Sequence, residues 1–304
     1  MKTTKSQLPT PNILRMIFVI LVIFVLAGTV QARPDKVEGV YISIWTMGVP
    51  QKFKHIVDRS VENGLNSIVC DFEGSSRLYK SNLDYAKAKG LYCIARIVVF
   101  QDGVGATIQT FQDPINWNKK IAWAKEAESI GFAEVQYDYI RFADTAAGSA
   151  EKKKEIIEQF LKEAKASVSV PVGIDVFGSV AYQPRQSIGQ DLARLANIID
   201  VVSPLLYPSH FDLDKKRMSQ PYETMLEGCL MAKKQLTGRP VRLIPFIQGF
   251  PLRLSYSGMN LKDYIIAQLK AVKAAGTDGY YIWHAGNDYT RTWEALKELN
   301  GIKS

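Results

Sequence analysis

The sequence predicts an α/β fold, a single (β/α)₈ TIM barrel preceded by an N-terminal signal or anchor segment. Runs rich in β-branched and aromatic residues alternate eight times with helical patterns beyond residue 38. No linker, low-complexity stretch or clear repeat interrupts this alternation. Acids, arginines and aromatic residues follow many of the runs, where a barrel would collect them at its C-terminal rim. One domain accounts for the chain, because such barrels commonly take about 250 residues.

The predicted strands are short apolar runs with high β-propensity. They cover residues 39–44, 67–73, 91–100, 134–142, 172–177, 201–207, 241–247 and 279–283. The fourth run is unusual, because it carries Gln136, Asp138 and Arg141 where a buried parallel strand would normally be apolar. Polar groups in such a strand need hydrogen-bond partners or a function.

Each strand is followed by a segment with helical periodicity. The predicted helices cover residues 51–63, 82–89, 116–130, 150–168, 188–199, 221–236, 261–275 and 291–300. Asn116 and Asn260 are predicted N-caps, and Gly131 and Gly276 follow the helix ends. The rival fold is a doubly wound sheet, and the first strand argues against it because Thr46-Met-Gly-Val-Pro50 is no Gly-rich phosphate loop.

Residues 1–32 have the pattern of a targeting segment. Basic residues precede a wholly apolar run over residues 16–27, and Val30-Gln-Ala32 supplies small residues at the spacing that a signal peptidase reads. The run is shorter than the ~20 apolar residues of a comfortable transmembrane span. We expect cleavage after Ala32, which leaves residues 33–304 as the barrel domain.

An exported barrel would reside in the periplasm, in the cell envelope or outside the cell. The alternative is an uncleaved membrane anchor within residues 16–30, which would be the protein's one link to a membrane. The sequence carries no signal for an oligomeric state.

Composition bounds the partners and cofactors. The net charge is +8, yet the basic residues are scattered along helical segments without the dense basic block of a nucleic-acid groove, so no nucleic-acid partner is expected. The three cysteines form no CxxC or Cys/His pair at ligand spacing, so neither a disulfide framework nor a metal site or other cofactor is expected. A hard cation on Asp71, Glu73 and Asp102 stays open as the one metal hypothesis.

Polar and aromatic side chains at the predicted strand ends form the candidate site. Asp138 and Asp175, on the fourth and fifth strands, are the candidate catalytic acids. The candidate substrate-binding residues are Asp71, Glu73, Arg96, Arg141, Tyr207, His210, Trp283 and Asn287. Two carboxyls and planar rings are what glycosidic bond cleavage requires, so a carbohydrate is the expected substrate.

Adjacent strands lie about 4.8 Å apart, so the two acids could approach the roughly 5 Å carboxyl separation of retaining enzymes. Arg96 or Arg141 could hold one acid ionised while burial keeps the other protonated. Which acid takes which role stays open. A purely structural ion-pair network is the alternative for Arg96 and Asp71.

Some candidates have a second interpretation. His210 could bind a substrate hydroxyl or be simply an exposed loop residue, and Trp283 could be a sugar platform or a core ring. Three other aromatic residues, Tyr41, Trp45 and Tyr139, are expected to pack in the core.

Several motifs, in order along the chain, carry a family resemblance. They are Gly39-Val-Tyr-Ile-Ser43, Ala95-Arg-Ile-Val-Val-Phe100, Val135-Gln-Tyr-Asp-Tyr-Ile-Arg-Phe142, Ile174-Asp-Val-Phe-Gly178, Val202-Ser-Pro-Leu-Leu-Tyr-Pro-Ser-His210 and Ile282-Trp-His-Ala-Gly-Asn287. The chain beyond residue 38 resembles the bacterial glycosyl hydrolase domain family that is assigned to the TIM-barrel glycosidases. The resemblance implies a glycoside hydrolase-like barrel with Asp138 and Asp175 as active-site acids.

The chain departs from the family pattern at two places. Ala143 stands where the family tends to have proline, and Asp71-Phe-Glu-Gly74 is less acidic than the family's stretch near the second strand. The second departure puts the roles of Asp71 and Glu73 in doubt.

Two further function classes are alternatives to a glycoside hydrolase. A catalytically silent carbohydrate-binding barrel of the cell envelope is the alternative to an enzyme. A lyase or aldolase is disfavoured, because no predicted strand end offers a Schiff-base lysine.

Overall fold

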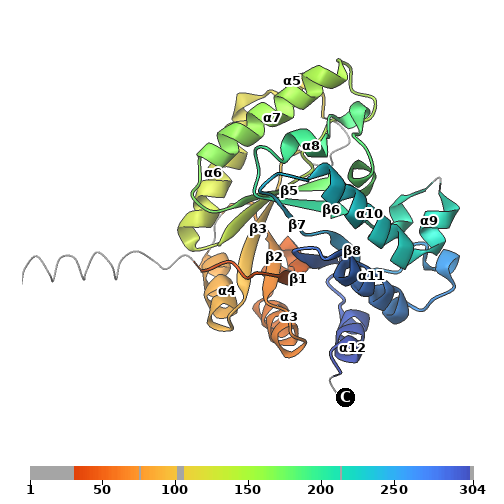
Figure 1. Ribbon diagram of the computed structural model, residues 1–304. Helices are drawn as coiled ribbons and strands as arrows, with labels where there is room; N and C mark the ends of the chain where they lie inside the picture. Colours follow the sequence, from red (N-terminus) through yellow and green to blue (C-terminus); the bar gives the residue numbers. More distant parts are fainter. Residues whose placement is uncertain (1–30, 75–76, 101–105, 213, 302–304) are drawn as a thin grey trace, which may run out of the picture. The chain divides into compact units, whose positions relative to one another are not determined.

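The computed structural model describes residues 31–74, 77–100, 106–212 and 214–301, and it confirms a closed parallel β/α-barrel (Figure 1). The strands are β1 (Val37–Ile42), β2 (Ser67–Asp71), β3 (Tyr92–Val98), β4 (Glu134–Asp138), β5 (Val172–Phe177), β6 (Val201–Leu205), β7 (Arg242–Leu243), β8 (Phe246–Gln248) and β9 (Gly279–Trp283). Each strand pairs in parallel with its neighbours, and the β1–β9 pairing closes the ring.

The seventh strand of the barrel is split in two. The predicted run over residues 241–247 becomes β7 and β8, which both pair with β6. Pro245 lies between them and has no N–H to donate to a ladder, so the strand is interrupted there. The nine strand segments therefore make an eight-stranded barrel.

Helices surround the strands (Figure 1). They are α2 (Ile44–Met47), α3 (Pro50–Glu62), α4 (Arg77–Ala88), α5 (Ile108–Phe111), α6 (Pro114–Ile130), α7 (Ala150–Ala166), α8 (Leu192–Leu195), α9 (Lys215–Ser219), α10 (Pro221–Gln235), α11 (Leu261–Ala275) and α12 (Thr290–Leu299). The predicted caps Asn260 and Gly276 are confirmed for α11.

Several predicted boundaries were wrong, and three of them have a local reason. The fourth strand ends at Asp138, because Tyr139 takes a positive φ of 55° that no strand accommodates. Helix α6 begins earlier than expected, since the Asp113 side chain caps it and Pro114 occupies its first turn. The helix expected over residues 188–199 shrinks to α8, because a looped segment with a bridge between Arg185 and Gln190 takes the place of its first part.

The apolar core has two layers. One lies between the strands and the helices and includes Phe53, Phe160 and Leu269. The other fills the barrel interior and includes Tyr92 and Tyr281. Within the interior, the amide nitrogen of the fourth-strand Gln136 donates a 3.0 Å hydrogen bond to Ser203 of β6, whereas its carbonyl oxygen is buried without a partner in the described residues.

The described part of the chain contains no helix that is both long and apolar enough to cross a membrane. The predicted signal or anchor segment falls almost wholly on residues 1–30, which lie outside the described residues.

The opposite, N-terminal end of the barrel holds a buried glutamate. Glu134 begins β4 and is fully buried, 2.8 Å from the guanidinium of Arg33 and within hydrogen-bond distance of the Tyr92 hydroxyl at 3.2 Å. Arg242 donates to the carbonyl of Pro34, which holds the same segment in place at 3.0 Å. Burial raises the pKa of Glu134 to about 7, although Arg33 and Tyr92 oppose the shift.

This buried acid predicts a pH-dependent stability. Folding raises the pKa of Glu134 from its ordinary value of 4.5 to about 7, so its contribution to stability is present below pH 4.5 and is lost as the pH rises to 7. We expect Glu134→Gln to flatten the fall in unfolding free energy over this range by up to about 3 kcal/mol. Urea unfolding at both pH values measures this effect. The exposed Glu62→Gln is the matched control, and equal slopes for wild type and Glu134→Gln would contradict the prediction.

Candidate active site

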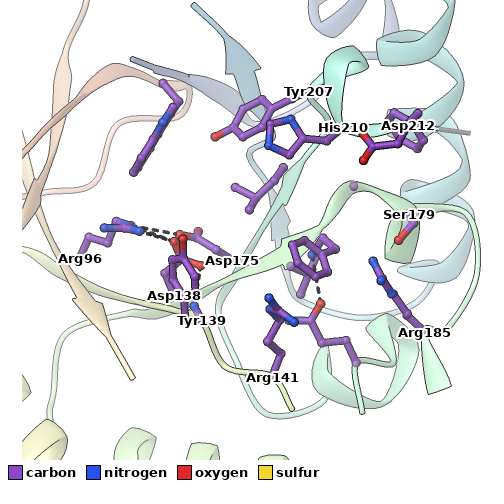
Figure 2. Close-up of a pocket in the computed structure, with 17 residues that line it drawn as sticks. Arg96, Asp138, Tyr139, Arg141, Asp175, Ser179, Arg185, Tyr207, His210 and Asp212 are labelled. Carbon is purple, nitrogen blue, oxygen red and sulfur yellow. Dashed lines mark hydrogen bonds and ion pairs between the residues drawn. The ribbon is translucent and has the colours of Figure 1, made fainter. Parts of the chain in front are cut away.

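The candidate site is organised around one buried arginine at the C-terminal ends of the strands. Arg96 on β3 is only 4% exposed, and the strand register places Asp71 of β2 directly beside it. Its guanidinium bonds to Asp71 on one side and to Asp138 of β4 on the other. The Arg96 Nε lies 3.0 Å from Oδ2 of Asp138 and 3.7 Å from Oδ2 of Asp175. Carboxyls from β2, β4 and β5 thus approach one cation on β3, and Figure 2 shows the two from β4 and β5, Asp138 and Asp175, beside Arg96.

Asp138 is held as an acceptor of hydrogen bonds. Its Oδ2 accepts from two nitrogens of Arg96, and its Oδ1 accepts from the backbone N–H of Tyr139 at 2.6 Å. The Tyr139 backbone also has a positive φ of 55°, and local strain of that kind is common at functional sites. The N–H groups stabilise the ionised carboxylate and fix its orientation.

Asp175 has the opposite environment. It is 1% exposed, and no N–H or O–H group of the described residues donates a hydrogen bond to either of its oxygens. Burial, followed by the charge of Asp138, raises the pKa of Asp175 well above its ordinary value, and Arg96 only partly offsets this. Both effects favour the neutral, protonated form of Asp175 beside the Asp138 carboxylate.

Asp71 supports the arginine from behind. Its carboxylate accepts hydrogen bonds from Arg96 and from the Tyr41 hydroxyl. The ring of Tyr41 stacks on Trp283 with centroids 3.7 Å apart, and the Arg96 guanidinium lies 4.8 Å from the Trp283 ring. These contacts place an aromatic wall beside the acid pair.

A cavity of about 460 Å³ opens above this cluster. It brings together most of the predicted site residues: Arg96, Asp138, Arg141, Asp175, Tyr207, His210 and Trp283. Tyr207 is buried, with its ring edge-to-face against Phe250 at 5.4 Å, whereas His210 is exposed and lies 3.0 Å from the Ser209 hydroxyl through Nδ1. The cavity size is in the range of small-molecule and saccharide sites.

The structure does not bring the other predicted residues to the cavity wall. Asp71 lies behind Arg96, and Glu73 is exposed beyond the end of β2. Asn287 is structural: its side chain accepts hydrogen bonds from Ser43 and donates to the carbonyls of Tyr41 and His284, which fixes the end of β1. An amide engaged on all sides by backbone has no group left for a substrate.

The expectation about aromatic packing was correct for Tyr41 alone. Tyr41 is buried, but Trp45 in α2 is 84% exposed and Tyr139 is 37% exposed. Both follow strand ends, so their rings are available at the rim of the barrel. The β-rich surroundings in the sequence gave no indication that these rings would face solvent.

Several lining residues were not identified from the sequence. Ser179, Arg185 and Asp212 come from irregular segments after β5 and β6. A signal was present in Gly178: a side chain there would come within 2.5 Å of the Leu205 carbonyl, so only glycine lets the turn after β5 approach β6 closely. This close approach shapes the wall on which Ser179 lies.

No group of three His, Cys, Asp or Glu side chains in the described residues is arranged to hold a metal ion. Of the three residues in the cation hypothesis, Asp71 is paired with Arg96, Glu73 is exposed, and Asp102 lies outside the described residues.

The fold and cavity define a class. A (β/α)₈ barrel with a carboxyl pair in an aromatic-walled rim cavity has the architecture of a barrel glycosidase. The family described as "Putative glycosyl hydrolase domain" matches residues 107–289, and the chain belongs to this family. The matched range contains Asp138 and Asp175 but is shorter than the resemblance noted in the sequence. No curated protein matches the chain by sequence.

Solved structures share the fold. The glycoside hydrolase domain of PgaB (BpsB) from Bordetella bronchiseptica has a TM-score of 0.69 at 12% identity, covering 89% of this chain and 100% of that chain. An endo-beta-1,4-mannanase from Thermotoga petrophila has a TM-score of 0.66 at 12% identity, with coverage of 90% and 78%. The spore cortex-lytic enzyme SleL from Bacillus cereus has a TM-score of 0.59 at 15% identity, with coverage of 86% and 74%. At these identities the likeness concerns the fold alone.

The different environments of the two acids predict different responses to the same substitution. Asp175→Asn replaces a neutral carboxyl with a neutral amide that still donates to Asp138, so we expect a change in unfolding free energy within about 1 kcal/mol. Asp138→Asn removes the charge that faces Arg96, and we expect a loss of about 3 kcal/mol. Urea denaturation at pH 7 compares them. A larger loss for Asp175→Asn than for Asp138→Asn would contradict the protonated state of Asp175.

Proposed function

We propose that the protein is an exported glycoside hydrolase that cleaves glycosidic bonds of a poly- or oligosaccharide with the Asp138–Asp175 pair. The observation that carries this proposal is the asymmetry of the pair within one cavity: Asp138 is bonded to Arg96, and Asp175 is buried without a donor of its own. Divergent environments for two neighbouring acids are the usual means by which one supplies a proton and the other carries charge.

In this proposal Asp175 is the source of the proton and Asp138 the charged partner. The proton moves from Asp175 to the leaving glycosidic oxygen. The carboxylate of Asp138 either stabilises the positive charge that develops at the anomeric carbon or attacks that carbon. Arg96 fixes the orientation of Asp138 through two nitrogens, so little rearrangement is needed during the reaction.

The spacing of the acids favours retention of anomeric configuration. Both carboxyls reach one nitrogen of Arg96, at 3.0 and 3.7 Å. Inverting enzymes separate their acids by roughly 6.5–9.5 Å to admit a water molecule and retaining enzymes by roughly 5–5.5 Å, and two carboxyls that approach the same guanidinium nitrogen fit the shorter separation better.

Aromatic rings support a saccharide as substrate. Trp283 borders the cavity beside the acids, and Tyr207 lines it from β6. Trp45 extends from the same rim with 84% of its surface exposed, which suits stacking on a sugar outside the cavity. The proposal of export rests on the sequence pattern of residues 1–32.

The proposed mechanism requires both acids for activity. We expect the purified protein to release reducing ends from at least one glycan in a panel of bacterial envelope and storage polysaccharides, and we expect Asp138→Asn and Asp175→Asn each to lower the rate by at least about 10³-fold. Colorimetric reducing-end assays with circular dichroism of each variant separate lost chemistry from lost folding. Glycan binding without release by the wild type would favour the alternative of a carbohydrate-binding barrel.

The proposed mechanism also makes the activity depend on pH. The reaction needs a proton on the pair, and the pKa of Asp175 is raised well above its ordinary value of 3.8 by burial and by Asp138. Activity should therefore persist above the ordinary titration range of an aspartic acid and fall only as the pH rises through the raised pKa. A profile of kcat/KM against pH measures the alkaline limb, and a limb centred near 3.8 would contradict the assignment of the proton to Asp175.

A further inference from the structure

One wall of the cavity carries two arginines beside a single ring. Arg141 follows β4 and Arg185 lies in the segment after β5, and both line the cavity. Their guanidinium carbons lie 4.5 and 4.9 Å from the centre of the Phe177 ring. Figure 2 shows both side chains on the part of the cavity away from Arg96. This wall is thus distinct from the cluster that holds the acid pair.

The charges of the cavity lining are balanced except at one position. Arg141 has no acidic group within ion-pair distance in the described residues, and it donates one weak hydrogen bond, to the Phe142 carbonyl at 3.3 Å. It therefore does not orient either catalytic acid, which was one of its expected roles. The other charged lining residues are paired: Arg96 with Asp138, Arg185 with Asp144, and Asp212 with Arg253.

The position of Arg141 is unfavourable for an isolated cation. The side chain is half-buried, and burial lowers the pKa of its guanidinium, which Asp144 only partly offsets. A partly desolvated charge without an ion-pair partner is destabilising, and within the described residues the Phe142 carbonyl is the one acceptor given for the five N–H donors of this guanidinium. An anion entering the cavity would supply the missing partner.

A second polar group of this wall is also without a partner. Ser179 lines the same cavity, and its hydroxyl oxygen is buried just beneath the wall and makes no hydrogen bond within the described residues. The close approach of Gly178 to Leu205 fixes the turn on which Ser179 lies. A buried hydroxyl without a partner indicates a ligand group at this wall.

We infer that Arg141, with Ser179 and the stacked Arg185, forms a subsite for a carboxylated sugar residue, so that the substrate is an acidic glycan. The inference rests on the proposed function, because it assigns a substrate class to the same cavity. A carboxylate matches the two parallel N–H groups of a guanidinium and forms a charge-assisted pair with it, which a neutral hydroxyl cannot do. The net charge is +8 for the whole sequence and stays positive without the basic residues Lys2, Lys5 and Arg15 of the targeting segment, which favours the approach of an anionic polymer.

The charge of Arg185 is already paired with Asp144, so Arg185 shapes the wall rather than supplying a free cation. Its guanidinium donates to both carboxylate oxygens of Asp144 at 2.9 and 3.0 Å, and Ser187 donates to the same acid at 2.8 Å. These bonds hold the guanidinium against Phe177 and leave Arg141 as the charge that distinguishes an acidic sugar from a neutral one.

The experiment compares each acidic glycan with its own neutral form. Hexamers of galacturonate, mannuronate and hyaluronan, and the same hexamers after reduction of their carboxyl groups to alcohols, are titrated calorimetrically into the full chain. We expect at least one carboxylated hexamer to bind about 10- to 100-fold more tightly than its reduced form, as a charge-assisted pair would give. Arg141→Gln should abolish this difference, and Arg141→Lys should restore part of it.

The matched control removes an arginine that lies outside the cavity. Arg291→Gln removes an exposed arginine of α12, 59% exposed and paired with Glu294, and should leave the preference unchanged. Equal binding of carboxylated and reduced hexamers, absence of binding by every carboxylated hexamer, or a preference that survives Arg141→Gln would overturn the inference. A sulfated hexamer that binds through Arg141 more tightly than the carboxylated ones would overturn the assignment to a carboxylate.

The outcomes also separate this inference from the proposed function. Hydrolysis of neutral glycans at a rate indifferent to Arg141→Gln would leave the hydrolase intact and remove the acidic subsite. Suppose instead that a carboxylated hexamer binds through Arg141 but that neither the wild type nor Asp138→Asn releases reducing ends from any glycan. That result would retain the subsite and remove the hydrolase.

Discussion

The carboxyls of three neighbouring strands meet at the guanidinium of Arg96, and the geometry of the site depends on that contact. A buried arginine is stable only with its charge compensated, and Asp71 and Asp138 compensate it from opposite sides. Asp175 is left as the surplus acid in a dry position, so it keeps a proton. One cation thereby gives two chemically similar residues different protonation states.

The barrel makes this contact possible because parallel strands bring their carboxyl ends to one rim. The register aligns Asp71 with Arg96, and Val98, two residues beyond Arg96 on β3, with Asp138 of β4. The opposite end of the barrel uses a similar device, where Arg33 faces the buried Glu134. The N-terminal end thus holds a buried acid beside an arginine, whereas the C-terminal end carries the network of the candidate site, as the two ends of such barrels usually divide their roles.

Helices and strands were predicted accurately where residues near in sequence determine their ends. The α11 helix was predicted to the residue, because the Asn260 side chain caps its first turn and Gly276, which has no side chain, takes the left-handed conformation that ends it. The fourth strand was overextended, because the aromatic and β-branched residues beyond Asp138 have strand propensity that a turn at Tyr139 overrides. Likewise, periodicity could not reveal that the segment before α8 folds back on itself as a bridged loop.

The amino-acid pattern alone was sufficient for the eightfold alternation, the strand that carries Asp138, and the gathering of polar residues at strand ends, because each depends on neighbours in the chain. Tertiary structure decided which of those residues share a cavity. It turned Asn287 toward backbone, left Arg141 without an acid, and exposed Trp45, because partners and burial are set by residues distant in sequence. The protonation of Asp175 belongs to the same group, since it depends on a burial that only the closed barrel provides.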